Sequence, residues 1–258
     1  MQRVAAIALN TFREAVRDRV LYNLIVFALL LIGTAILFGE ISIGIQTLIL
    51  INLGLAAITF FGLAIAIFIG IGLVYKELDK RTLYALLSKP VRRYEFILGK
   101  FGGLALTLLI NTAFMTAGFF LALYYVKRSF DAGDPPILVA IYFIFLQLLL
   151  ATALALLFSC FSSPVLSAAF TLGLFLVGSF AADLKDLADA LEAPWLEGVM
   201  RAIYYAVPNF SNFNVITAVA HGHSVPATLF WSNTAYAAVY ITLVLLASML
   251  IFQNRNLK

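Results

Sequence analysis

Charged residues are scarce in this chain of 258 residues: Asp, Glu, Lys and Arg make up 12 % of it. A typical soluble domain carries about 25 %. So few polar side chains cannot cover a globule of this size, which excludes a soluble fold. Hydrophobic residues make up 63 % of the chain and the mean hydropathy is +1.02. Much of the outer surface must therefore face lipid hydrocarbon.

Cysteine and histidine are nearly absent as well. The single cysteine, Cys160, cannot form an intramolecular disulfide, and no Cys/His cluster has the spacing of zinc ligands, so redox chemistry is not indicated. His221 and His223 flank one glycine, and imidazoles in an outer loop would suit copper or zinc. An ordinary exposed loop is the alternative interpretation, and the sequence leaves both open.

The apolar runs are continuous rather than alternating, which favours helices over a closed barrel as the spanning structure. The predicted fold class is therefore all-α, a polytopic transmembrane helical bundle in which residues 1–258 form a single domain. We predict six spans, at residues 20–38, from after Glu40 to Tyr75, and at 96–126, 137–158, 164–182 and 230–252.

Residues 1–19 precede the first span and hold four arginines. Ala5, Leu9, Phe12 and Val16 fall close to one face of a helix, which predicts a helix lying at the membrane interface. A signal peptide is the alternative, but the apolar run that follows is too long and lacks a convincing cleavage site.

The distribution of basic residues predicts the orientation. With residue 1 in the cytoplasm, Lys and Arg divide into 13 inside and 4 outside, and Asp and Glu into 5 inside and 8 outside. Because basic residues concentrate in cytoplasmic segments, both termini are expected to lie in the cytoplasm. The membrane that holds the protein is expected to be the inner (cytoplasmic) membrane of the cell. Nucleic acid is not an expected partner, since the basic residues are explained by topology.

Residues 76–93, between the second and third predicted spans, form the most informative segment. Leu83, Leu86 and Leu87 make an apolar stripe among charges, and Pro90 should end the helix at Lys89. A protruding amphipathic helix suits a docking groove on a partner. A loop whose basic residues contact anionic lipid is an equally good interpretation of the pattern alone.

This segment resembles the coupling-helix segment of type-2 ABC exporter permeases. The family pattern is an acidic residue, Gly-Thr, Leu-Leu-Ser, Pro, Arg and Gly-Lys. Its counterparts here are Glu77, Thr82, Leu86, Leu87, Ser88, Pro90, Arg93, Gly99 and Lys100. Arg81 stands where the family usually has glycine, so the local turn should differ. Residues 10–14 also resemble the connecting helix of these permeases, and the six-span layout matches over nearly the whole chain. The broad likeness within the family is to permeases linked with multi-copper enzyme maturation.

The resemblance implies a subunit that joins a second permease half, identical or not, and two separate ABC ATPase subunits, with ATP and Mg²⁺ bound by the ATPases. A phosphate loop is lacking here, since Tyr94 stands where the leading glycine before Gly99-Lys100 would be. We therefore expect no enzyme activity and no cofactor on this chain. The apolar stripe and the resemblance together give the candidate ATPase-coupling residues, which are Glu77, Arg81, Thr82, Leu83, Leu86, Leu87, Pro90 and Arg93.

The predicted spans lack Asp and Glu between their ends, and this weakens the alternative of an ion-coupled secondary transporter. An integral-membrane enzyme is disfavoured because the spans hold no convincing nucleophile, base or metal-ligand set. Lys100 is expected to snorkel to the cytoplasmic edge. The other polar residues of the spans are expected to bond between helices or to line a path. They are Gln46, Asn52, Asn111, Thr116 and Gln147.

Small residues in two of the spans are expected to allow close helix approach. They are Ala66 with Gly70, and Gly99 with Gly102 and Gly103.

Residues 183–229 are predicted as an external loop. Leucines from Leu184 onward, with Trp195 and Val199, recur at helical spacing and predict an interfacial helix. Asp183, Asp186 and Asp189 would suit a metal–diphosphate site, but no second acidic motif accompanies them, and a solvated helix face is the simpler interpretation. The sequence does not identify the transported substrate.

Overall fold

The computed structural model describes residues 2–41, 44–79, 92–129, 135–183, 198–201, 204 and 207–254. Within these residues the regular elements are helices and no strand occurs, which confirms the all-α class. The elements are α1 (Gln2–Val16), α2 (Arg19–Ile41), α3 (Gln46–Asp79), α5 (Arg93–Lys127), α6 (Pro135–Ser159), α7 (Pro164–Ser179), η1 (Ser211–Phe213), α10 (Ile216–Ala220) and α11 (Ala227–Asn254).

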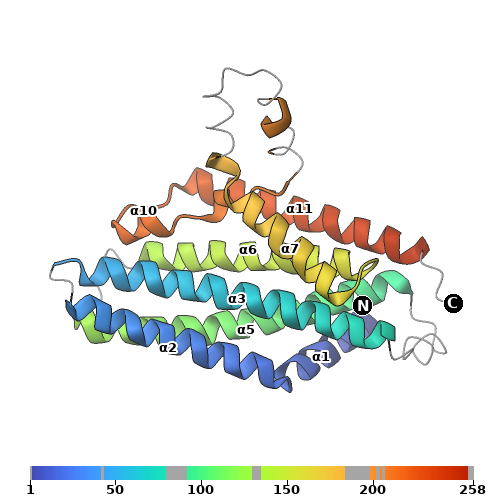
Figure 1. The fold of residues 1–258 in the computed structure, drawn as a ribbon, viewed down its shortest axis with the longest axis horizontal. Helices are drawn as coiled ribbons and strands as arrows, with labels where there is room; N and C mark the ends of the chain where they lie inside the picture. Colours follow the sequence, from blue (N-terminus) through green and yellow to red (C-terminus); the bar gives the residue numbers. More distant parts are fainter. Residues whose placement is uncertain are drawn as a thin grey trace.

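The long helices lie side by side in one bundle, and both chain termini lie toward the same end of it (Figure 1). We call this the terminal end and the opposite one the distal end. Helix α3 ends and α5 begins at the terminal end, whereas α2 ends and α3 begins at the distal end. The predicted coupling segment therefore connects two helices at the terminal end.

Helices α3 and α6 form the centre of the bundle, with 67 % and 72 % of their apolar windows buried inside the protein. The corresponding values are 22 % for α2 and 28 % for α11, so these two helices lie at the periphery. Exposed side chains of α2 are large and apolar, among them Phe27, Leu30 and Leu37. A helix that is apolar on all sides suits a lipid environment, where the outer face needs no polar residues.

Five helices are long and apolar enough to cross a membrane, namely α2, α3, α5, α6 and α11. They correspond to five of the six predicted spans. The remaining span is α7, which has 16 residues. At 1.5 Å per residue α7 is about 24 Å long, shorter than the roughly 30 Å of the hydrocarbon core. This helix alone does not complete a crossing.

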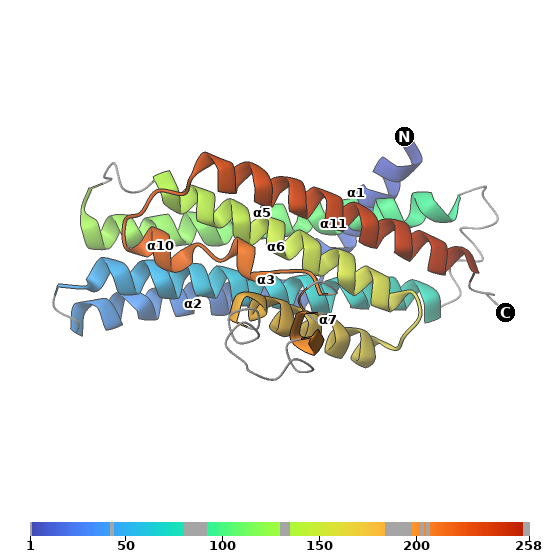
Figure 2. The ribbon, with the colours of Figure 1, turned by 90° about the horizontal axis from the view of Figure 1, so that it is seen from above.

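Residues 208–216 pack inside the bundle beyond the end of α7. Phe210 and Phe213 are at most 1 % exposed, and the segment leads over α3 and α6 to α10 at the distal end (Figure 2). The backbone N–H of Phe210 donates to the carbonyl oxygen of Gly178 at 2.9 Å, and that of Asn209 donates to the Tyr236 hydroxyl at 2.8 Å. Irregular backbone is tolerated at membrane depth only when protein or water satisfies it, and these bonds do so. The sequence did not predict this inward packing.

Helix α1 packs along α5 through the predicted small residues. A β-carbon at Gly99 would lie 2.6 Å from the Ile7 side chain, and one at Gly103 would lie 2.5 Å from the carbonyl oxygen of Ala8. The close approach expected of this glycine cluster is thus confirmed. After α1 the chain bends, and the Asp18 carboxylate accepts the Val20 N–H at 3.0 Å and caps the start of α2.

Helix α1 packs on α5 with a face other than the apolar face that the sequence predicts for the membrane interface. Ala5 and Leu9 of the expected face are exposed, Leu9 to 45 %, whereas Thr11 and Ala15 are fully buried. Helix α1 therefore presents one side to the bundle and an apolar stripe to its surroundings, which fits a helix at the membrane interface.

Candidate functional site

The first turn of α5 carries the described residues closest to the predicted coupling segment. A Glu95 carboxylate oxygen accepts the backbone N–H of Arg92 at 2.9 Å. A carboxylate in the first turn also interacts favourably with the positive end of the helix dipole. These contacts define where α5 begins, directly after the undescribed residues 80–91.

Arg93 joins the start of α5 to the end of α11. Its Nη1 donates hydrogen bonds to the carbonyl oxygens of Phe252 at 2.9 Å and Gln253 at 2.6 Å. Carbonyls in the last turn of a helix lack partners within the helix, and a guanidinium there satisfies them. The rings of Phe96 and Phe252 stack beside this contact, with centroids 5.6 Å apart. A movement of the α5 start would therefore reach α11 directly.

Most of the predicted coupling residues lie outside the described part of the chain. Arg93 is described, and Glu77 belongs by its backbone to the last turns of α3, but nothing is shown of its side chain. The others, Arg81, Thr82, Leu83, Leu86, Leu87 and Pro90, fall between α3 and α5 in the undescribed range 80–91. Their assignment stays a prediction.

Lys100 does not snorkel to the bundle surface, so that expectation is wrong. The side chain is 1 % exposed, and its Nζ lies 5.8 Å from the centroid of the Phe96 ring, a cation–π contact. The reason is tertiary, because α5 packs against α1, α3, α6 and α11, and Phe96, one turn before Lys100, stacks on Phe252 of α11. The sequence around Lys100 gives no sign that another helix covers it.

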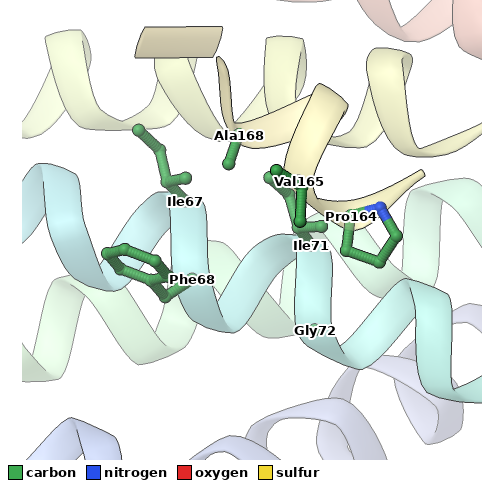
Figure 3. A pocket seen from close by; sticks show the side chains of 7 residues that line it. All are labelled: Ile67, Phe68, Ile71, Gly72, Pro164, Val165 and Ala168. Atoms are coloured by element: carbon green, nitrogen blue, oxygen red, sulfur yellow. The ribbon is translucent and has the colours of Figure 1, made fainter. Parts of the chain in front are cut away.

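An apolar cavity of about 290 Å³ lies between α3 and α7 in the terminal half of the bundle. Figure 3 shows Ile67, Phe68 and Ile71 of α3 on one side and residues from the start of α7 on the other. Phe68 is 61 % exposed and Val165 80 % exposed, so the cavity opens at the outer surface of the described bundle. Its lining suits an alkyl or aromatic group.

A second cavity, of about 180 Å³, is lined by α3, α6, α7 and residues 210–216. Its lining contains five uncharged polar residues, Thr59, Gln147, Ser179, Ser211 and Asn214. We call it the polar cavity.

The polar cavity lies about midway along the bundle, because Gln147 is the middle residue of α6. Helix α6 begins at Pro135 at the distal end, so about 18 Å of helix separate that end from Gln147 at 1.5 Å per residue. A bilayer core about 30 Å thick would place this position near its middle.

Gln147 is the polar cavity's least satisfied side chain. It is 6 % exposed, and its amide forms no hydrogen bond with any residue that the structure describes. The amide is not among the fully enclosed polar atoms that lack a partner, so it keeps access to the open space of the cavity. By contrast, the hydroxyls of Thr59 and Ser179 donate to carbonyl oxygens of their own helices, at 2.9 and 2.7 Å.

The polar residues expected to bond between helices behave differently. The side-chain amides of Asn52 and Asn111 donate to carbonyl oxygens four residues earlier in their own helices, at 2.9 and 2.8 Å. Bonds between elements come instead from residues that the sequence did not single out, at the Tyr142–Thr234 hydroxyl pair and from Asn233 to the Asn212 carbonyl. Serine, threonine, tyrosine and asparagine bond readily to backbone or neighbours, so the sequence alone does not select among them.

The histidine pair lies in an exposed turn. His221 Nδ1 lies 2.8 Å from the Thr217 carbonyl oxygen, which makes Nδ1 the hydrogen-bond donor, and His223 is also exposed. Among the described residues, no group of three His, Cys, Asp or Glu side chains could hold a metal ion. Metal binding by two histidines alone stays a hypothesis.

The family model described as ABC-2 family transporter protein matches residues 5–257. The chain belongs to this family. The match covers α1 to α11, so this ABC-2 permease uses the whole described bundle as its membrane part. It is a multi-pass transmembrane subunit of a transporter, as the resemblance predicted. No curated protein sequence matches the chain.

Proposed function

We propose that this ABC-2 permease is the membrane-spanning half of an ATP-driven exporter and that a separate ATPase docks on residues 76–93. The family match over residues 5–257 is the observation that carries the proposal. It is supported by the position of the segment between α3 and α5 at the terminal end, where the basic residues of the chain also concentrate. Two permease halves and two ATPases would form the working complex, with ATP and Mg²⁺ on the ATPases.

In the proposed mechanism, closure of the ATPases on ATP moves the coupling segment. The motion passes to α3 and α5, the helices that the segment connects, and through the Arg93 bonds to α11. We expect helix α1 to move with α5, because the two helices pack closely at Gly99 and Gly103. The apolar cavity between α3 and α7 is the proposed place where an apolar part of the cargo enters.

The coupling role is tested by replacing Leu86 and Leu87 together with Asp. Burying one leucine is worth about 1.5–3 kcal/mol, whereas an exposed ion pair contributes roughly 0–1 kcal/mol, so the leucines should dominate docking. We expect the double variant to insert normally but to lose its ATPase in co-purification and its substrate-stimulated hydrolysis. The matched control, Arg81→Ala, should lose less, and its loss should depend on salt.

Equal membrane abundance of all variants is the condition for this comparison. If the double Asp variant kept full ATPase binding and stimulation, residues 76–93 would be a lipid-contacting loop. The mass of the active complex tests the assembly separately, since a complex holding one permease copy would contradict two halves.

A further inference from the structure

We propose that the polar cavity binds an uncharged molecule or lipid headgroup that carries several hydroxyl groups. This inference deepens the proposed transport function, because in a transporter the occupant would be the polar part of the cargo. Binding itself needs no ATPase. A failed binding test would therefore not contradict the ATPase docking proposal. A failed docking test would likewise not contradict ligand binding in the polar cavity.

The described lining disfavours an ionised occupant. The ten described residues around the cavity include no Asp, Glu, Lys, Arg or His. An ion at this depth would lose its hydration without gaining a counter-charge, and that is strongly unfavourable. An uncharged polar group meets a much smaller penalty, which hydrogen bonds to the lining offset.

The hydrogen-bonding groups of the lining match hydroxyls. Gln147 offers an N–H₂ donor and a carbonyl acceptor, neither used by a described residue. The hydroxyl oxygens of Thr59 and Ser179 remain acceptors, because their protons go to carbonyls of their own helices. Asn214 adds a second amide at the exposed side of the cavity. A hydroxyl both donates and accepts, so a polyol can use every one of these groups.

The aromatic residues of the lining and the volume of the cavity further restrict which ligand can bind. Phe175, Phe210 and Phe213 line the cavity, and the first two rings lie 5.0 Å apart with a tilt of 46°. Such rings favour the carbon–hydrogen faces of a polyol over a purely aqueous filling. The volume of about 180 Å³ is below the roughly 300–1,000 Å³ of sites for drug-sized ligands. The cavity therefore suits a compact polyol or a headgroup of similar size.

The test is saturation-transfer NMR on the purified full-length chain in phosphatidylcholine nanodiscs, with empty nanodiscs as the blank. The probes are glycerol, erythritol and methyl glucoside, compared with glycerol 3-phosphate and choline as charged molecules of similar size. We expect transfer to the uncharged probes and little to the charged ones. Nanodiscs that also contain a monoacylglycerol distinguish a lipid headgroup from a soluble molecule as the occupant. If the monoacylglycerol displaces bound glycerol, the occupant is a lipid headgroup. If glycerol stays bound, the occupant is a soluble molecule.

Two pairs of variants connect binding to the cavity. Gln147→Leu and Thr59→Val remove polar groups from its lining, and we expect glycerol binding about tenfold weaker, as the loss of one or two hydrogen bonds predicts. Their matched controls are Asn111→Leu and Thr107→Val, which remove buried polar groups of the same kinds outside the cavity and should bind normally.

Thr59→Val conserves side-chain shape, so it decides the question if Gln147→Leu fails to fold. No transfer to the uncharged probes above the blank would overturn the proposal and leave a cavity that holds only water. Equal transfer to the charged probes, or full binding in well-folded cavity variants, would overturn it as well.

Discussion

Gly103 is a residue at which one methyl group should disturb the contact between two helices. A β-carbon there would lie 2.5 Å from the Ala8 carbonyl oxygen and 2.6 Å from the Thr11 β-carbon. The Ala8 oxygen belongs to backbone and cannot rotate away, so Gly103→Ala should lower the free energy of unfolding by about 1–3 kcal/mol. Thermal denaturation in detergent measures this. Gly102→Ala is the control, because its β-carbon would lie 3.6 Å from that of Ala8, an ordinary contact. Equal losses in both variants would contradict the prediction.

Gly178 has the same role where α7 meets residues 208–216. A β-carbon there would overlap the Pro208 carbonyl oxygen and lie 2.7 Å from the Phe210 ring. We expect Gly178→Ala to push this segment away from α7 and to speed hydrogen exchange of the Phe210 amide, which donates to the Gly178 carbonyl. Gly173→Ala, with open space around its β-carbon, should exchange like the unchanged protein. An unchanged Phe210 amide in the Gly178 variant would count against close packing of the segment on α7.

At the scale of the helix, Arg93 should hold the last turn of α11 in place. Arg93→Ala removes both bonds to the Phe252 and Gln253 carbonyls, so we expect faster hydrogen exchange in the last turn of α11, with little change at its distal start. Arg92→Ala is the matched control, since Arg92 is exposed and its guanidinium contacts the Tyr94 hydroxyl, at 3.5 Å, rather than α11. Similar exchange in both variants would mean that α11 ends without help from α5.

The existence of the long helices could be predicted from the sequence, because long apolar runs cannot stay in lipid in any other form. Where the sequence predicted a span at 96–126, the structure has the helix Arg93–Lys127. The span predicted at 137–158 corresponds to the helix Pro135–Ser159. Their ends differ by a few residues because the helices continue slightly beyond the apolar runs, with Arg93 to Glu95 at the start of α5 and Ser159 at the end of α6. The span predicted at 164–182 became the shorter α7, since its apolar run continues after the helix has ended at Ser179.

The contacts between elements could not be predicted in the same way. Lys100 is buried among the packed helices, and the face of α1 that packs on α5 includes Thr11 rather than the more apolar Leu9. Leu9 lies on the face predicted for the membrane interface, and the sequence did not show that the small face with Thr11 would pack on the glycines of α5. Likewise, nothing local distinguishes the inward-facing Phe210 and Phe213 from aromatic residues that anchor a loop at the membrane interface. Of the candidate coupling residues, the sequence identified Arg93 but not its partners on α11.

For the whole molecule, the charge distribution predicts which end faces the cytoplasm. The test uses single cysteines in a Cys160→Ala background, where Cys160 is the only native thiol and is buried. An impermeant thiol reagent added outside intact cells should label Asp189→Cys but not Arg13→Cys, which is exposed on α1. Permeabilised cells should give label at both. Reaction of Asp189→Cys only from the cytoplasmic side would reverse the orientation and with it the docking proposal.

The dependence of α7 on residues 208–216 has a consequence for biogenesis. An insertion machinery reads hydrophobic segments as they emerge, yet the end of α7 receives its partner, the Phe210 N–H, from a segment about 30 residues downstream. That segment in turn bonds through Asn209 to Tyr236 of α11, the last helix to be synthesised. The centre of the bundle can assemble while the ribosome is still working, but this region can close only after α11 has entered the membrane. A chain truncated before α11 should therefore keep its early spans and leave α7 exposed to quality-control proteases.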